Sequence, residues 1–286
     1  MGDVLVVTDS ACDLTEELAV GNSITVVPLT IRFGDEEFVD RQDLSPEDFW
    51  RRCKGVEKLP ETAAPAPGAF RAAFEAAADA GAAGVLCLTI SGGVSATYQS
   101  ACTGAEELRA RLPVEVIDTR TLTMGQGLLA LDAAEAARGG ASLEEVAARV
   151  RRSMERTRVY GVVDTLEHLQ KGGRIGGAAA LVGSLLSIKP VIQVKGGIVE
   201  QESRQRTRVR SLEYLAGKVK GDVPLDRLAV ASGAAEDVGV LLSMLEDVEV
   251  SHPLITTDLG PVVGTHAGPG AIGVCYVTRP AVGEHQ

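Results

Sequence analysis

Short apolar runs alternate along the chain with longer segments whose apolar residues recur at helical spacing. Each run ends at small or polar residues, and we expect buried strands over residues 4–8, 85–90, 114–117, 159–163, 228–231 and 272–277. The longer segments predict helices over residues 67–80, 95–112, 123–138, 142–156, 177–186, 204–219 and 236–245. Strands that alternate with helices of this length indicate crossover units around a mostly parallel sheet.

The second half of the chain departs from this alternation. Two apolar segments, residues 191–194 and 198–200, flank Lys195-Gly196-Gly197, which is a hairpin signal and predicts a mixed sheet. A helix rich in Arg and Glu ends near Arg158. We therefore expect an α/β protein of two lobes, with a mostly parallel, doubly wound sheet in residues 1–158 and a mixed sheet in residues 159–286.

Composition narrows the possible functions. Apolar residues make up 45% of the 286 residues and aromatic residues only 3%, so any apolar pocket should be lined by aliphatic side chains. A formal net charge of -11 argues against binding to nucleic acid or to an anionic membrane surface. The five cysteines are scattered without a CxxC pair, which indicates a reduced, cytoplasmic protein and gives no sign of a metal site. The first apolar run is too short for a signal peptide, and no later run reaches the length of a membrane span.

Loops that follow the carboxyl ends of strands are the first place to look for a ligand site. The loop after the first strand carries Asp9 and Ser10, which could equally well serve as helix caps. The loop after residues 85–90 carries Ser91, two glycines and Ser95, and we expect Ser95 to be the N-cap of the next helix. Free N–H groups at such a helix start favour a carboxylate or a phosphate, although an ordinary capped turn has the same pattern.

Two further loops present single polar side chains among residues that stiffen or bend the backbone. Two prolines follow Thr62, and His266 stands among three glycines and a proline in residues 264–270. The stretch of residues 171–177 is glycine-rich but lacks the Gly-Lys-Ser/Thr ending of a nucleotide-binding loop. Arg206 belongs to a dense basic group at residues 204–210, which is either a solvated face or a contact for an anion or an acidic partner. The sequence contains no GxSxG, HExxH or early GxGxxG motif, so we expect no catalysis by this chain alone.

Taken in order, several of these segments resemble the DegV family, whose members are alike over their full length. The resemblance is carried by Asp9-Ser10 with Asp13-Leu14, residues 62–68, ISGGVSATYQSA at 90–101, residues 118–127, LQKGGRIGG and LLSIKP within 169–190, and HAGPG at 266–270. The chain departs from the family pattern at Ala63, Ala64 and Ala66, where the family has Ser, Gln and Ser, and at Ala96, where it has Gly. Thr62 and Ser95 are retained.

This resemblance implies a long-chain fatty acid, such as palmitate or oleate, lying between the two lobes. By the same likeness, the hydroxyls of Thr62 and Ser95 hold its carboxylate, while His266, Arg206, Ser91, Asp9 and Ser10 are candidates for head-group or partner contacts. The family role further implies a protein that is not itself an enzyme and needs no cofactor. It would present the carboxylate to a separate ATP-binding subunit of a fatty acid kinase.

Two other readings stay open at this point. The chain could be a stand-alone serine-dependent acyl hydrolase or transferase, with Ser95 as nucleophile, His266 as base and Asp9 as orienting group. It could also be a regulatory protein in which the lipid only fills the interior. Acyl length, unsaturation and oligomeric state do not follow from the sequence.

Overall fold

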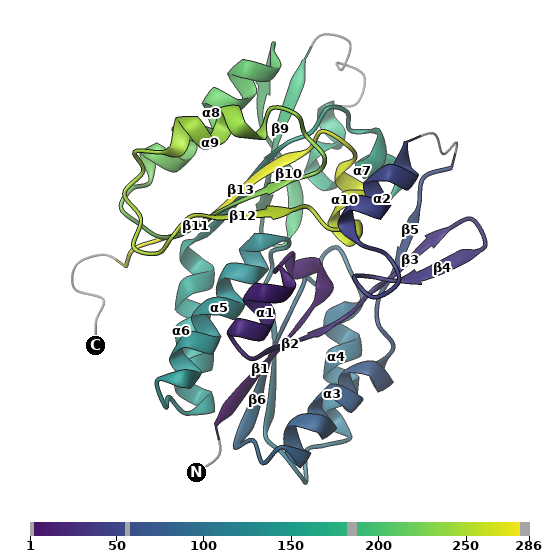
Figure 1. The fold of residues 1–286 in the computed structure, drawn as a ribbon, viewed down its shortest axis with the longest axis vertical. Coiled ribbons are helices and arrows are strands. Elements are labelled where there is room, and N and C mark those ends of the chain that lie inside the picture. Colours follow the sequence, from purple (N-terminus) through teal and green to yellow (C-terminus); the bar gives the residue numbers. More distant parts are fainter. Residues whose placement is uncertain (1–2, 55–57, 182–187, 281–286) are drawn as a thin grey trace.

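The computed structural model describes residues 3–54, 58–181 and 188–280, and the strands within these ranges form three sheets. Figure 1 shows two α/β lobes, with the amino-terminal lobe at the bottom and the second lobe above it. A small third sheet lies beside their junction. The expected two-lobed α/β architecture is confirmed.

The first lobe is built on a four-stranded sheet in the order β2-β1-β6-β7, with all neighbours parallel. Its strands are β1 (Val4–Asp9), β2 (Ile24–Val27), β6 (Gly84–Thr89) and β7 (Val114–Asp118). Short α1 (Glu16–Gly21) precedes β2, α3 (Pro67–Asp79) and α4 (Thr97–Glu106) pack on one face, and α5 (Met124–Arg138) and α6 (Leu143–Arg156) pack on the other. Because both faces are covered, every residue of β6 is buried, and the strand has no alternating pattern.

The second lobe contains a six-stranded mixed sheet in the order β10-β9-β8-β13-β11-β12. Its strands are β8 (Thr157–Val162), β9 (Lys189–Lys195), β10 (Ile198–Gln205), β11 (Leu225–Ser232), β12 (Ile255–Asp258) and β13 (Ile272–Thr278). Only β11 and β12 pair in parallel, and the predicted β9–β10 hairpin is present. Helices α8 (Arg208–Gly221) and α9 (Val238–Leu245) cover the face of this sheet that points away from the first lobe.

A three-stranded antiparallel sheet, which the sequence pattern did not predict, connects the lobes. It contains β3 (Thr30–Phe33), β4 (Glu36–Val39) and β5 (Glu61–Ala63), and α2 (Pro46–Cys53) lies next to it. Trp50 of α2 is buried and donates its indole N–H to the carbonyl of Leu259, 3.0 Å away. Gly264 lies against the same ring in α10 (Pro261–Ala267), where a Cβ would come within 2.7 Å of the indole. This close packing fastens the small sheet to the second lobe.

The carboxylate of Asp13, directly after the short 3-10 helix η1 (Ser10–Cys12), is fully buried and joins the two lobes. It accepts hydrogen bonds from the hydroxyl of Thr123 at 2.6 Å and from the backbone N–H of Gly260 at 3.0 Å. Arg41 pairs with it at 3.3 Å, and Thr257 donates to its backbone carbonyl at 2.9 Å. Gly260 and Thr257 belong to the second lobe, so this single side chain and its carbonyl bind both halves of the chain.

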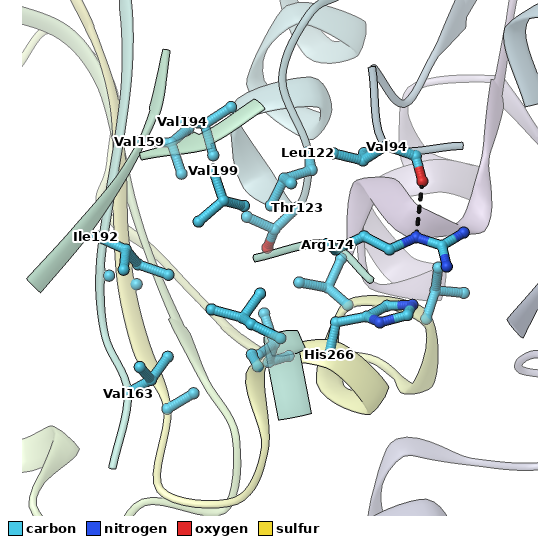
Figure 2. A pocket seen from close by; sticks show the side chains of 18 of the residues that line it. Val94, Leu122, Thr123, Val159, Val163, Arg174, Ile192, Val194, Val199 and His266 are labelled. Atoms are coloured by element: carbon cyan, nitrogen blue, oxygen red, sulfur yellow. Dashed lines mark hydrogen bonds between the residues drawn. The ribbon is translucent and has the colours of Figure 1, made fainter. Parts of the chain in front are cut away.

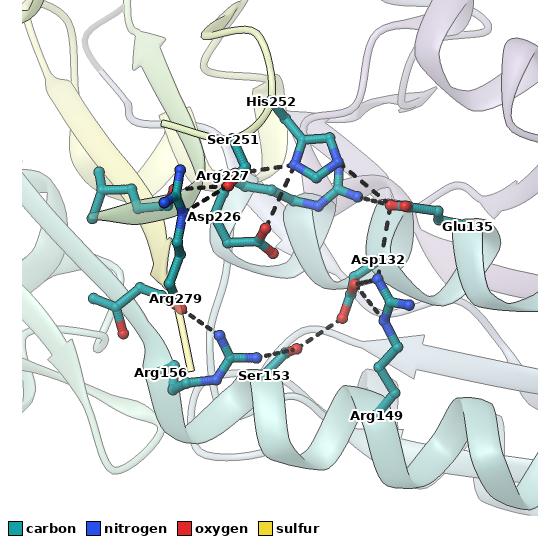
Figure 3. Close-up of polar contacts among 12 residues, drawn as sticks. Asp132, Glu135, Arg149, Ser153, Arg156, Asp226, Arg227, Ser251, His252 and Arg279 are labelled. Atoms are coloured by element: carbon teal, nitrogen blue, oxygen red, sulfur yellow. Dashed lines mark hydrogen bonds and ion pairs between the residues drawn. The ribbon is translucent and has the colours of Figure 1, made fainter. Parts of the chain in front are cut away.

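A charged network on the exposed side of α5 forms a second connection between the lobes (Figure 3). Asp132 of α5 is nearly buried and pairs with Arg149 of α6 at 2.7 Å. Glu135, one turn later on α5, pairs with Arg227 of β11 and lies 3.6 Å from His252. Arg227 is itself buried, so Glu135 neutralises a charge that would otherwise be costly to bury. The network holds α5 against the sheet of the second lobe.

Three predicted helices differ from the structure. The one expected at residues 95–112 is shorter and ends at Glu106. The predicted helix at residues 204–219 begins only at Arg208, because residues up to Gln205 continue the hairpin as β10. Arg204 and Arg208 therefore do not share a helix face. The predicted helix at residues 177–186 is a 3-10 helix, η2 (Gly176–Leu181), where it is described, and residues 182–187 lie outside the described part of the chain.

The chain crosses between the lobes directly after α6. That helix ends at Arg156, and β8 of the six-stranded sheet begins at Thr157. We propose that the lobes divide at this connection, next to the expected boundary at residue 158. Among the described residues, no helix combines the length and the apolar character needed to cross a membrane.

Asp40 leads to a prediction about stability and pH. Its side chain is 1% exposed, and neither carboxyl oxygen has a hydrogen-bond partner among the described residues. Burial raises its pKa from 3.8 to about 7, although the nearby hydroxyl of Ser10 and then the positive charge of Arg41 oppose the shift. The Asp40 carboxyl keeps its proton to higher pH in the folded state than in the unfolded state. The free energy of unfolding that Asp40 contributes is therefore lost as pH rises from about 4 to about 7.

We therefore expect Asp40→Asn, which keeps the shape but cannot ionise, to raise the free energy of unfolding at about pH 8 relative to the wild type. At about 1.4 kcal/mol per pKa unit the gain is at most about 4 kcal/mol, and it should vanish near pH 4. Urea unfolding at several pH values measures it. Asp35→Asn, at an exposed turn position, is the control and should leave the pH profile unchanged. A variant less stable than the wild type at every pH would contradict this account of Asp40.

Candidate functional site

An apolar cavity lies between the lobes and encloses about 870 Å³ of space between protein atoms, counted to its open mouth. Strands β8, β9, β10 and β13 and helix α10 form one wall, and loops of the first lobe form the other. The aliphatic side chains that line it include Leu29, Ile90, Val94, Leu122, Val159, Val163, Ile192, Val194, Val199 and Val262. The low aromatic content predicted an aliphatic lining of this kind, and the cavity suits a flexible hydrocarbon chain.

Strand β8 and the residue after it contribute to the cavity lining. Val159 and Gly161 of β8 and Val163, which directly follows the strand, line the cavity at alternate positions of the chain. A Cβ at Gly161 would meet nothing closer than 3.6 Å, the distance to Ile192 and to the carbonyl of Ile272. A Cβ would therefore fit at ordinary van der Waals contact, and a larger side chain would have to take up space of the cavity that Gly161 lines.

Polar groups gather at one end of the cavity. Figure 2 shows Arg174 and His266 together on one side, opposite the aliphatic side chains of Val159, Ile192 and Val194. Thr62 also lines this end, and its Oγ1 lies 3.1 Å from Nε2 of His266. Strand β5 positions Thr62 through its pairing with β3, and His266 stands in the last turn of α10. Residues 204 positions apart in the chain thus form one hydrogen-bonded pair.

His266 is uncharged at neutral pH. Burial, and then the positive charge of Arg174, lower its pKa from 6.5 to about 4. Its Nδ1 is buried and has no hydrogen-bond partner among the described residues. A neutral imidazole carries one N–H, so the ring either donates to Thr62 or accepts from it. If Nε2 carries the proton, the hydroxyl of Thr62 is free to donate to a ligand.

Arg174, which the sequence analysis did not select, supplies a positive charge at this end. Its Nε donates to the carbonyl of Val94 at 3.0 Å, and Nη1 donates to the carbonyl of Gly172 at 2.7 Å. These carbonyls come from the two lobes, and the bond to Val94 is drawn in Figure 2. The residue lies within LQKGGRIGG, whose sequence pattern does not indicate which side chain points into the cavity.

Ser95 lines the cavity but does not cap α4 as predicted. The helix begins at Thr97, and its N-cap residue is Ala96, which has no side-chain capping bond. The Oγ of Ser95 instead shares a hydrogen bond with the hydroxyl of Thr97 at 2.8 Å and accepts from the N–H of Thr97 at 3.3 Å. Its hydroxyl lies in the same cavity as Thr62, with the helix start behind it.

The other residues predicted to contact a head group or a partner either make hydrogen bonds within the protein or lie outside the cavity. Asp9 accepts from the backbone N–H groups of Ala11 and Ile90 and from the side chain of Gln126. Ser10 accepts from Leu29 N–H, and Ser91 donates to the carbonyl of Gly197 at 2.6 Å, which anchors the hairpin turn. None of these three hydroxyl or carboxyl groups lines the cavity. Arg206 is exposed in the turn between β10 and α8, outside the cavity lining.

A catalytic triad is not assembled by these residues. The buried carboxylate of Asp9 is bonded to Ile90, Ala11 and Gln126, and His266 is bonded to Thr62. Among the described residues, no hydrogen bond links Ser95 to His266 or His266 to Asp9. The geometry therefore suits the holding of a polar head group better than the activation of a serine.

Comparisons with known proteins agree with this architecture. The model for an uncharacterised protein of the DegV family matches residues 3–279. A DegV domain-containing protein of Streptomyces coelicolor is 35% identical, over 96% of this chain and 99% of its own length.

Solved structures are similar over nearly the whole chain. One is described as showing fatty acid binding by a DegV family protein from Thermus thermophilus. It has a TM-score of 0.90 and 32% identity and covers 97% of this chain and all of that one. Another, DegV, a fatty acid binding protein from Bacillus subtilis, has a TM-score of 0.85 and 28% identity over 98% and 100% of the two chains. With one family model over almost its full length and relatives above 30% identity, the chain belongs to the DegV family.

Proposed function

We propose that this protein binds one long-chain fatty acid, with the hydrocarbon in the cavity between the lobes and the carboxylate at Thr62, Ser95 and Arg174. The observation that carries the proposal is an aliphatic cavity that ends at a single polar group of hydroxyls, an imidazole and a guanidinium. Solved relatives described as fatty-acid-binding support it. The protein presents that carboxylate to a separate ATP-binding subunit of a fatty acid kinase.

Burial of the hydrocarbon supplies the binding energy. Each methylene removed from water contributes about 0.8 kcal/mol, so a sixteen-carbon chain contributes on the order of 10 kcal/mol before the cost of association. Most of the lining side chains are aliphatic, and the hydroxyl of Thr123, which also lines the cavity, already donates to Asp13. Unbranched chains of different length should therefore bind in the order of the apolar area that they bury.

A carboxylate placed at the polar end of such a cavity needs donors and a positive charge. Thr62 and Ser95 supply hydroxyls, and Arg174 supplies the charge. His266 acts through Thr62: a neutral ring that donates from Nε2 holds the Thr62 oxygen and turns its O–H toward the ligand. His266 is thus a positioning residue, and Arg206 remains a candidate contact for the partner subunit because it is exposed.

Native mass spectrometry of the purified protein, before and after incubation with palmitate and oleate, tests the binding. One fatty acid per chain, identified after denaturing extraction, is the expected result. For the kinase role, the loaded protein is mixed with ATP, its ATP-binding subunit and hydroxylamine, which converts an acyl phosphate to a stable hydroxamate. The hydroxamate should form only when all components are present. Ester hydrolysis by the chain alone, abolished by Ser95→Ala, would instead favour the hydrolase reading.

We expect Thr62→Val and Ser95→Ala each to weaken palmitate binding by roughly ten- to a hundredfold. A hydrogen bond to a charged group is worth about 1.5–3 kcal/mol, and each variant removes one such donor while nearly conserving volume. Displacement of a fluorescent fatty acid measures the change. Thr103→Val, at an exposed position of α4, is the control and should bind as the wild type does. Unchanged affinity in both test variants would place the carboxylate elsewhere.

Gly161 should set the length of chain that fits. We expect Gly161→Leu to lower the affinity for an eighteen-carbon acid by at least roughly tenfold, because its side chain occupies cavity space equal to a few methylenes, each worth about 0.8 kcal/mol. The loss for a ten-carbon acid should be smaller. Gly217→Leu, at an exposed site of α8 where a Cβ meets nothing within 4 Å, is the matched control. Equal losses for both acids would show that Gly161 does not limit chain length.

A further inference from the structure

Helix α9 is apolar on the side that faces away from the protein. Its eight residues, Val238–Leu245, include no charged side chain, although 23% of the residues of the whole chain are charged. Leu241 is fully buried on the inner side, whereas Gly239, Val240 and Ser243 are exposed on the outer side. Val240 keeps 45% of its surface exposed. Surface helices normally present charged residues to water, so this composition is typical of a helix that is covered on its outer side as well.

Helix α8 continues this surface. The two helices lie side by side on the face of the six-stranded sheet that points away from the first lobe (Figure 1). They start at one level, because Arg208 in the first turn of α8 pairs with Asp237, the N-cap residue of α9, at 2.8 Å. Val209 follows this arginine and is 54% exposed. We call the surface formed by Val209, Glu213, Gly239, Val240 and Ser243 the α8–α9 face.

The two helices carry opposite charges at the borders of the α8–α9 face. The exposed residues at the ends of α8 are basic, with Arg210 at its start and Lys220 at its end. Those that flank α9 are acidic, with Glu236 before it and Glu246 and Asp247 after it. Among the described residues, none of these five side chains belongs to an ion pair. The α8–α9 face therefore has a basic half and an acidic half.

We propose that the α8–α9 face is a contact between two copies of this chain, with α8 of one copy packed against α9 of the other around a two-fold axis that runs between the helices. A two-fold contact uses the same surface of both copies, so a surface with a basic and an acidic half pairs with itself. This inference does not depend on what the cavity binds.

The charged residues come to matching levels in this arrangement. Rotation about an axis parallel to the helices keeps each residue at its distance from the helix starts. At about 1.5 Å per residue, Lys220 lies about 18 Å from the level of the ion pair that joins the helix starts, and Asp247 about 15 Å. Arg210 lies about 3 Å to one side of that level and Glu236 about 2 Å to the other. A long basic side chain spans both differences, so unlike charges meet at both ends of the contact.

Apolar and small residues lie between these charges. Val209 and Val240 are within about 3 Å of one level, so α8 of one copy places its valine against Val240 of the other. Gly239 has no side chain at that level, and a Cβ there would meet nothing within 4 Å. Glu213, the exposed acid in the middle of α8, comes to the level of Ser243, whose hydroxyl can donate to it. The α8–α9 face thus matches a second copy of itself in both charge and polarity.

The contact is small and lies away from the cavity. Helices of 14 and 8 residues are about 21 Å and 12 Å long, so the pair outlines roughly 300–400 Å² per copy. Specific interfaces bury about 600–1,000 Å² per partner, and we therefore expect a weak dimer. The cavity lies on the opposite face of the same sheet, so the contact does not cover the cavity of either copy.

Sedimentation equilibrium at about 5 to 500 µM protein tests the contact. The mean mass should rise with concentration from 29.8 kDa toward twice that value, with a dissociation constant of roughly 10–100 µM. Val240→Arg puts a charge into the apolar part of the contact, near Arg210 of the second copy, and should weaken association at least roughly tenfold. Val20→Arg, at a 72% exposed position of α1, makes the same change in net charge and is the matched control.

A charge exchange separates this arrangement from association through another surface. Lys220→Glu and Asp247→Lys should each weaken the dimer by roughly tenfold, because each pair occurs twice and reversal replaces attraction by repulsion. The double variant Lys220→Glu/Asp247→Lys should regain the wild-type dissociation constant within about threefold. Thermal unfolding confirms that each variant is folded.

The inference is overturned if the wild-type protein keeps a mass of 29.8 kDa at every concentration. It is equally overturned if Val240→Arg associates as Val20→Arg does, or if the double variant stays as weak as the single ones. None of these results depends on fatty acid binding, so they leave the proposed function untouched.

Discussion

The buried carboxylate of Asp13 is the interaction on which the ligand cavity depends. Each lobe contributes one side of the cavity, and neither lobe encloses the cavity alone. Asp13 binds Thr123 of the first lobe and Gly260 of the second through its two carboxylate oxygens, and Arg41 balances its charge. Gly260 is the N-cap residue of α10, so the same contact that fixes the lobes also fixes the helix that carries His266. The position of the polar end of the cavity thus follows from a structural carboxylate that does not itself line the cavity.

Segments of the first half of the chain that pack on the second lobe also fix the position of α10. Trp50 and the small antiparallel sheet lie against α10, and β5 of that sheet carries Thr62. Thr62 and His266 therefore meet because two separate contacts, one at Asp13 and one at Trp50, hold α10 in place. The cost of burying polar groups here is met by pairing them across the lobes, as it is for Arg227 and Glu135 on α5.

Sequence patterns predicted longer strands and helices and missed the short, partly exposed strands of the small sheet. The strands β1, β6, β7, β8, β11 and β13 and helices α3, α5 and α6 lie close to their predicted bounds, because buried runs and amphipathic periods are local signals. Strands β3, β4 and β5 are three or four residues long and partly exposed, so their pattern is too short to detect. Thr62 and Ser95 were found by resemblance and lie at the cavity, whereas Arg174 was missed because its direction depends on Val94, 80 residues away. The sequence could not distinguish Asp9 and Ser10 from ligand-binding residues, because the same residue types also accept hydrogen bonds from the backbone of a structured loop.

The charge of Arg174 dominates the polar end of the cavity. Its guanidinium donates to two carbonyls, which are dipoles and do not neutralise its charge, and among the described residues no carboxylate pairs with it. That charge helps to keep His266 neutral, because a second positive charge beside it would be unfavourable. In the complex that we propose, a carboxylate beside Arg174 supplies the opposite charge while both carbonyl bonds are kept. A preorganised donor set of this kind favours affinity, since the ordering cost is met in folding rather than in binding.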